Sequence, residues 1–215
     1  DISERRGYEF HATVFHRSSL LVRHQINALF WNEPDGSYYE RCENGSCVER
    51  LTNESSLAIL YGVIPLHRRE RLLQSLQRLE TDWGVVNAMP PYEGFASGHY
   101  QNMTDWPVLD GMNAGARLSV GNANWYAPLT KWWVYFDSVR EDGEKLPEFI
   151  SPTDLTGGRS QAWSVSPIVS FIRYGLGVNP DLSGQFTIKP SQIGETKLKN
   201  IWMRGNRISV QAKSK

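Results

Sequence analysis

Residues 146–167, LPEFISPTDLTGGRSQAWSVSP, contain the pattern from which the fold and the site are inferred. A single carboxylate, Glu148, follows Pro147, a Gly-Gly bend comes next, and an aromatic residue leads into a helix predicted over about 161–176. Because proline fixes its own φ, the chain approaches Glu148 in a restricted direction. A carboxylate held in this way in the connection before a helix is a candidate functional residue.

The rest of the chain is organised as helices followed by a different tail. Apolar periodicity and Pro or Gly breaks predict helices over about 10–31, 53–61, 65–83, 108–120 and 123–139. Residues 84–107 lack a period and are rich in Pro, Gly and aromatic residues, which is typical of a functional loop. Alternation and Gly-Asn turns after residue 180 predict short strands. The sequence therefore predicts a mainly α region over 1–180 and a β-rich segment over 181–215.

Composition argues against two classes of partner. The formal net charge is zero, which argues against a nucleic-acid-binding protein, and no apolar run approaches the roughly 20 residues that span a bilayer. Eight Trp and nine Tyr are many for 215 residues. This excess favours either a flat-faced ligand such as a carbohydrate or a large aromatic core.

The chain begins without Met, so we expect that a preceding segment has been removed.

A close cysteine pair and three glycosylation sequons indicate the compartment. Cys42 and Cys47 flank an Asn-Gly turn, so their thiols can meet in a disulfide within a tight loop. The sequons place candidate glycans on Asn44, Asn53 and Asn102. Together these features predict a secreted or luminal glycoprotein. The alternative is two free thiols and chance sequons.

The sequence lacks the motifs of several common sites. It contains no P-loop, GxGxxG, HExxH or GxSxG pattern. His11 and His16 are five residues apart, which fits one helix face poorly, so we predict no metal and no cofactor. What remains is a set of carboxylates and aromatic residues in or beside the loops: Glu148 with Tyr92, Glu93, Phe95, Tyr100, Asp105, Trp106, Asp110 and Trp163.

These residue types suit carbohydrate chemistry. Aromatic rings can pack against the CH faces of sugars, and carboxylates bind hydroxyl groups. Hydrolysis of a glycosidic bond by the inverting route needs an acid and a base roughly 6.5–9.5 Å apart. The alternatives are local: Glu93 and Asp110 fit a surface ion pair or a helix cap, and Glu148 fits an ion pair with Lys145 or Arg159.

Three segments resemble known glycosidases. GGRSQAWSVSPIVSFIRYGLGVNPDLSGQFTIKPS, residues 157–191, resembles the late segment of α-L-rhamnosidase-type enzymes, and GSYYERCENGSCVERLTNESSLAILYGVIP, residues 36–65, is similar to their earlier hairpin. HYQNMTDWPVLDG, residues 99–111, resembles the His/Tyr-x-Asn-Gly-x-x-Trp-Pro element of debranching and α-glucosidase-type enzymes with the same six-hairpin architecture. The resemblance extends from about residue 20 to 210.

The resemblance implies a fold and a mechanism. It implies part of an (α/α)6 toroid of helical hairpins with a short C-terminal β element, and inverting hydrolysis of terminal α-linked sugars such as rhamnosyl or glucosyl units. Glu148 takes the place of the general base in the loop before the last helix, Trp163 the floor of the sugar pocket, and His99 joins the residues predicted to contact substrate.

Two departures from these families bear on the function. About six or seven helices are predicted where six hairpins need twelve. In these families the general acid lies on an earlier hairpin, and that region is absent from this sequence. Met103 also stands where debranching-type enzymes favour Gly. A partial toroid would expose a large apolar face, so we expect a second polypeptide, or an upstream part of the same precursor, to complete it.

Three functions are therefore compared. The first is the C-terminal portion of a secreted inverting glycoside hydrolase. The second is a non-catalytic structural or carbohydrate-binding glycoprotein of the same architecture. The third is a helical interaction domain whose aromatic residues all belong to the core.

Overall fold

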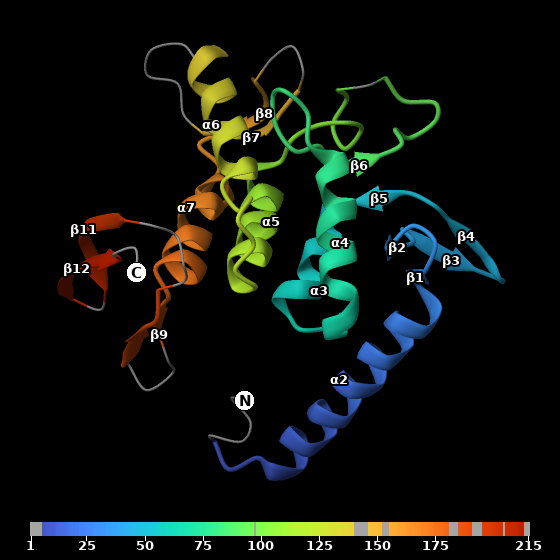
Figure 1. Cartoon of the computed structure of the whole chain (residues 1–215), viewed down its shortest axis with the longest axis horizontal. Helices are drawn as coiled ribbons and strands as arrows, with labels where there is room; N and C mark the ends of the chain where they lie inside the picture. The colour runs from blue at the N-terminus through green and yellow to red at the C-terminus, as the bar shows by residue number, and fades with distance from the viewer. Residues whose placement is uncertain are drawn as a thin grey trace.

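The computed structural model describes seven segments of the chain: residues 6–96, 98–139, 146–151, 155–180, 185–190, 195–203 and 205–212. Helices dominate the first two thirds, and short antiparallel strand pairs connect and follow them (Figure 1). The α-helices are α2 (Glu9–Leu29), α3 (Leu57–Leu60), α4 (Arg69–Leu76), α5 (Pro107–Ser119), α6 (Ala127–Val139) and α7 (Ser166–Ser170).

Shorter turns extend several of these helices. The 3-10 turns η1 (Asn53–Ser56), η2 (Leu66–Arg68), η3 (Gln77–Leu79) and η4 (Ala162–Val165) lie at the ends of α3, α4 and α7, and the π-turn η5 (Phe171–Gly175) continues α7. The helix predicted over about 161–176 is therefore a succession of 3-10, α and π turns. The helix predicted over 53–61 likewise begins as a 3-10 turn.

Each strand pairs with one antiparallel neighbour. The pairs are β1 (Trp31–Asn32) with β2 (Ser37–Tyr38), β3 (Arg41–Glu43) with β4 (Ser46–Val48), β5 (Leu51–Thr52) with β6 (Ala88–Met89), β7 (Pro147–Ile150) with β8 (Leu155–Arg159), β9 (Val178–Pro180) with β10 (Phe186–Ile188), and β11 (Thr196–Met203) with β12 (Asn206–Ala212). The strands predicted in the tail are thus present. The proposed domain boundary after residue 180 stays a prediction.

Helix α5 is the centre of the fold. It lies between α7 on one side and α3 and α4 on the other (Figure 1). Nine of its 13 residues are buried, and Gly111 and Gly115 lie where an added Cβ would meet Ser166 at 2.3 Å and Tyr174 at 2.8 Å. These glycines allow α7 and η5 to approach α5 closely. The main apolar core lies beside α5: Trp31, Tyr38, Leu51, Ile59, Ile64, Leu72, Leu73, Leu76, Leu79, Val85, Val86 and Ala116.

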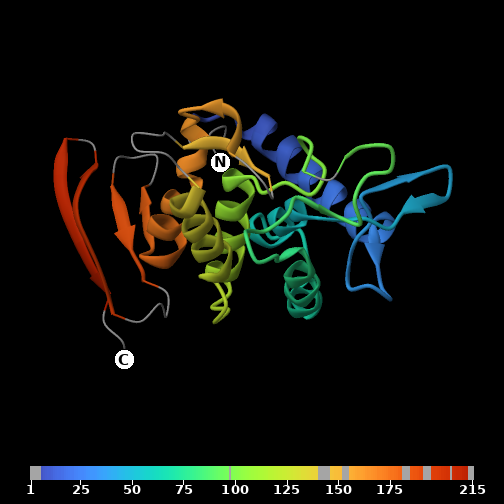
Figure 2. The same ribbon diagram turned by 90° about the horizontal axis from the view of Figure 1, so that it is seen from above.

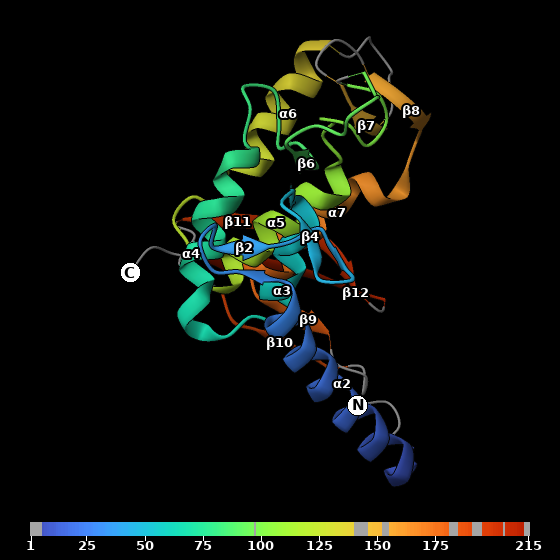
Figure 3. The same cartoon turned by 90° about the vertical axis from the view of Figure 1, so that its right-hand side faces the viewer.

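The first helix contributes little to that core. None of the 21 residues of α2 is buried, and the helix projects from the rest of the molecule (Figure 3). Ile26, and Phe30 just after the end of the helix, pack against the core. Phe15, Val22 and Leu29 are exposed. The helix prediction is confirmed in type, but the chain turns into β1 at Trp31, so the helix ends earlier than predicted.

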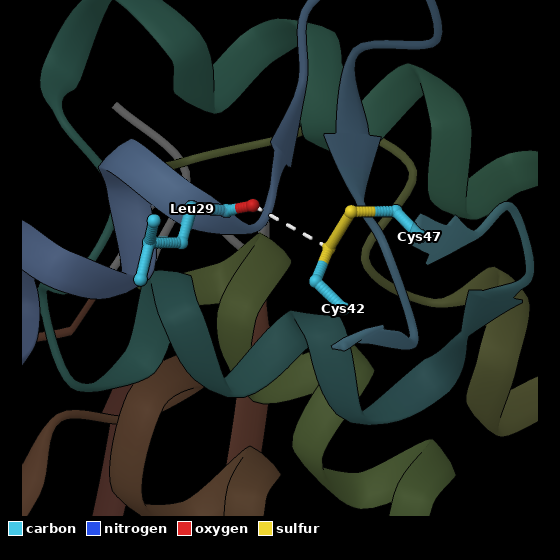
Figure 4. The surroundings of a disulfide bond; sticks show 3 residues. All are labelled: Leu29, Cys42 and Cys47. Atoms are coloured by element: carbon cyan, nitrogen blue, oxygen red, sulfur yellow. Dashed lines mark hydrogen bonds between the residues drawn. A yellow bond between two sulfur atoms is a disulfide. The ribbon is translucent and has the colours of Figure 1, made fainter. Parts of the chain in front are cut away.

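The two ends of the molecule are β-hairpins. β11 and β12 form one end, and β3 and β4 form the other (Figure 2). Cys42 and Cys47 face each other across the β3–β4 pair and form the predicted disulfide (Figure 4). The Sγ atom of Cys42 lies 3.5 Å from the carbonyl oxygen of Leu29, so the bridge packs against the end of α2.

The sequons differ in accessibility. Asn44 is exposed at the tip of the disulfide hairpin, and a glycan there remains a prediction. Asn53 is 0% and Asn102 3% exposed, and the Asn102 side-chain amide donates hydrogen bonds to three backbone carbonyls. A glycan needs the same amide nitrogen and open space around it. Glycosylation at Asn53 or Asn102 is therefore incompatible with this fold.

Candidate functional site

Two segments singled out in the sequence meet in the structure. The N–H groups of Asp105 and Ile150 each donate to the other residue's carbonyl oxygen, both at 2.8 Å. This reciprocal bridge joins the end of the 84–107 loop to β7. Glu148 lies on β7 and not in a loop as predicted, because Phe149 and Ile150 are buried and pair with Thr156 and Leu155 of β8.

Glu148 is half-buried at an irregularity in the strand pair. The register shifts between Pro147 and Phe149, so Glu148 lies at this shift, opposite Gly157 and Gly158. The N–H of Gly158 donates to Oε2 of Glu148 at 2.8 Å. Lys145 and the side chain of Arg159, the alternative ion-pair partners, lie outside what the structure describes.

Four aromatic side chains form a cluster beside β7. The ring centroids of Trp106 and Phe149 are 5.1 Å apart and stacked, and Tyr100 packs edge-on to both at 5.2 and 5.5 Å. Trp163 packs edge-on to Trp106 at 6.1 Å. Trp106 and Phe149 are buried, whereas Tyr100 and Trp163 are 49% and 44% exposed. The two exposed rings are therefore the ones that can contact a ligand.

A pocket of about 270 Å³ lies within the 84–107 loop. Asn102 holds this loop closed, because its side chain accepts from the N–H of Tyr92 at 2.6 Å and donates to the carbonyl of Phe95 at 2.9 Å. The hydroxyl of Tyr92 donates to Glu40 at 2.7 Å, and burial, followed by that hydrogen bond, raises the pKa of Tyr92 to about 12. The described residues that line the pocket are Tyr92, Phe95, His99, Tyr100, Gln101 and Asn102, and none of these six carries a carboxylate.

Several predicted ligand contacts are thus brought together. Tyr92, His99 and Tyr100 line one pocket, and Tyr100 connects it to the aromatic cluster with Trp106 and Trp163. Glu93 is exposed on the same loop but does not line the pocket. Whether any of these residues binds a substrate remains a proposal.

Asp105 and Asp110 do not fit the predicted role. Both carboxyl groups have no exposed surface, so neither can contact a ligand in this structure. Burial raises the pKa of Asp105 to about 7. Burial, and then the charge of Asp105, raises the pKa of Asp110 well above its usual range. The two groups form a buried acid pair at the start of α5 that favours retention of a proton.

The acid pair lies near a second buried polar network. The guanidinium of Arg117, which is 1% exposed, donates to Glu80 at 2.8 Å and to the side chain of Asn113 at 2.8 Å. Asn113 in turn donates to Asn53 at 2.8 Å. These hydrogen bonds tie the centre of α5 to η1 and to Glu80, which follows η3, so the polar face of α5 is structural.

The sequence reasoning missed other parts of the site. Phe149 completes the aromatic cluster, and Gly157 and Gly158 pack on Glu148. The Gly-Gly pair itself was the available signal, but it was interpreted only as a bend. Among the described residues, no group of three His, Cys, Asp or Glu side chains could hold a metal ion. None of the described helices combines the length and apolarity that a membrane crossing requires.

Comparisons with known proteins identify the fold. No family model and no curated protein sequence matches the chain. Among solved structures, a protein described as a sialidase has a TM-score of 0.71 and 14% identity, over 98% of this chain and 22% of its own. A GH63 mannosylglycerate hydrolase from Thermus thermophilus in complex with glucose has a TM-score of 0.56 and 20% identity, over 70% of this chain and 38% of its own.

A second structure of the GH63 enzyme, in complex with Tris and D-glycerate, gives a TM-score of 0.54 and 19% identity over 70% of this chain and 37% of its own. The chain thus spans well under half the length of these proteins. At such identities the likeness concerns the fold alone. The chain has the fold of a part of these glycoside hydrolases.

Proposed function

We propose that this chain is part of a secreted inverting glycoside hydrolase that acts on terminal α-linked sugars such as rhamnosyl or glucosyl units. The supporting observation is the environment of Glu148. One carboxylate oxygen accepts a hydrogen bond from Gly158, and within the described residues the other accepts none. A half-buried carboxylate held at one oxygen, next in the strand to Phe149 of the aromatic cluster, suits a general base for water.

In this mechanism Glu148 takes a proton from water as the water oxygen attacks the anomeric carbon. The glycosidic C–O bond breaks, and an acid on the opposite side protonates the leaving oxygen. Asp105 and Asp110 are buried and cannot fill that role. We therefore propose that the acid comes from a part of the assembly outside this chain. The coverage of only 22% of the similar sialidase structure agrees with this proposal.

The exposed face of α2 supports the same view. Phe10, Val14, Phe15, Leu21 and Val22 are between 42% and 76% exposed on this helix. Several large apolar side chains exposed along one helix are typical of an interface. We propose that the remaining helices of an (α/α)6 toroid cover it, supplied by a second polypeptide or by another part of the same precursor.

Association can be tested by native mass spectrometry of the purified protein, followed by the same sample denatured. We expect a second polypeptide, or a longer chain that contains this one, with additional helical hairpins and a carboxylate able to act as acid. A folded, monodisperse monomer of the 215 residues alone would contradict the proposal.

Activity can be tested with p-nitrophenyl α-L-rhamnoside and α-D-glucoside and the complete assembly. We expect hydrolysis, with the inverted anomer as the first product in ¹H NMR spectra. Release of the retained anomer would exclude the inverting mechanism. No release from a broad set of glycosides would exclude the hydrolase.

One observation favours a second function, a non-catalytic carbohydrate-binding protein. The burial of Asp105 and Asp110 leaves Glu148 without an accessible carboxylate partner in the described cluster. The aromatic pocket would then bind sugar without cleaving it. Sugar binding by the complete assembly, without turnover and unchanged by Glu148→Gln, would support this function.

In either case, the disulfide and the exposed sequon at Asn44 support secretion.

A further inference from the structure

The strand β8 packs unusually closely on Glu148. Gly157 has a φ of +78°, and a Cβ added there would lie 2.6 Å from Cβ and 2.7 Å from Oε2 of Glu148, and 2.8 Å from Cε1 of Phe149. These distances are shorter than any side chain tolerates. Only glycine therefore permits both the backbone conformation and the approach.

Gly158 has a different relation to the same carboxylate. Its N–H supplies the hydrogen bond to Oε2 at 2.8 Å. A Cβ added to Gly158 would meet the amide nitrogen of Gln161 at 2.3 Å but would lie 3.6 Å from Oε2, an ordinary contact. A side chain at Gly158 would therefore displace the flexible end of the Gln161 side chain, and it would not displace Glu148.

The segment after Gly158 is hydrogen-bonded to Leu146 and Pro147, the two residues before Glu148. The N–H of Gln161 donates to the carbonyl of Leu146 at 3.2 Å, and the hydroxyl of Ser164 donates to the carbonyl of Pro147. Ser164 is 1% exposed. These bonds fix the 157–164 segment relative to Glu148, so the donor at Gly158 is held in place.

We infer that Gly157 and Gly158 are positioning residues for Glu148. Gly157 sets the close approach of β8, and the Gly158 N–H fixes Oε2 so that Oε1 stays directed at the attacking water. The inference rests on the proposed function, because it assigns these glycines a role in the step in which Glu148 accepts a proton. It also makes the Gly-Gly pair a functional element and not only a bend.

The kinetic test compares two glycine variants in the complete assembly, with p-nitrophenyl α-glycosides as substrates. Gly157→Ala is expected to lower kcat by about 10- to 100-fold with KM changed less than about twofold, because a misplaced base slows proton transfer without removing sugar contacts.

Gly45→Ala is the control for backbone strain. Gly45 has a φ of +79°, and an added Cβ there meets nothing within 4 Å. It should leave kcat unchanged. In a Glu148→Gln background, Gly157→Ala should cause no further loss, because both changes act through the same carboxylate. Equal kcat for the Gly157 and Gly45 variants, or additive losses with Glu148→Gln, would overturn the inference.

A second measurement does not depend on activity. The Gly158 amide should exchange with deuterium at least about tenfold more slowly in the wild type than in Glu148→Ala, which lacks the acceptor. Equal exchange rates would show that the Gly158 N–H does not donate to Glu148, and would overturn the inference. If the wild type hydrolyses no glycoside but the amide is protected, the proposed function fails and the pair only stabilises the strand, which overturns the catalytic assignment.

Discussion

Glu148→Gln is expected to lower kcat on aryl α-glycosides by about 10²- to 10⁴-fold, the usual contribution of a general base. Glutamine has nearly the same shape, and its side-chain oxygen can still accept from the N–H of Gly158. It cannot accept a proton from water. The loss should therefore appear in kcat, while substrate affinity and thermal unfolding stay close to those of the wild type.

The matched control is Glu43→Gln, an exposed carboxylate in the disulfide hairpin. Its kcat should equal that of the wild type. A Glu148→Gln protein that retains more than about a tenth of the wild-type kcat would rule out Glu148 as general base. A decrease in kcat that accompanies unfolding, measured by circular dichroism, would assign the effect to structure.

Asp110→Asn is expected to stabilise the protein more at alkaline pH than at pH 5. Burial raises the pKa of Asp105 to about 7 and that of Asp110 well above its usual range. An unfolded Asp titrates near pH ~3.9. The folded state therefore binds more protons than the unfolded state above about pH 4, and the pair's contribution to stability is lost as pH rises through about 7.

Asparagine removes one titrating group and supplies an N–H donor to Asp105. Chemical denaturation in urea should give a free energy of unfolding for the variant that exceeds the wild-type value at pH 8 by on the order of 1–3 kcal/mol. The control is Asp82→Asn, which alters an exposed carboxylate. The difference in free energy of unfolding between Asp110→Asn and the wild type should therefore change with pH. If this difference is the same at pH 5 and pH 8, the assignment of a buried acid pair is wrong.

Local features of the fold were predictable. The long helices α2, α5 and α6 follow from apolar periodicity and from breaks at Pro and Gly. The disulfide follows from two cysteines on either side of an Asn-Gly turn. The irregular 84–107 loop contains little regular structure apart from β6, as expected. Each of these features depends on residues close together in the sequence.

The remaining features depend on contacts between distant residues. Asp105 and Asp110 carry the same chemistry in the sequence as exposed carboxylates, and only tertiary packing, such as that of Gly84 against Asp105, buries them. A Cβ at Gly84 would lie 1.8 Å from Oδ2 of Asp105. Asn53 and Asn102 likewise form sequons locally but are enclosed by the tertiary fold. The β7 strand could not be recognised because its partner follows a segment with no strand pattern.

The bridge between Asp105 and Ile150 has a consequence for how the protein folds. These residues are far apart in sequence, and their two hydrogen bonds close a long loop that contains α5 and α6. Closing such a loop costs chain entropy before its contacts form, so it is expected late on the folding pathway, after the local hairpins and α5. Glu148 would then be among the last residues to reach its native surroundings, and a nascent or partly folded chain would have no assembled site.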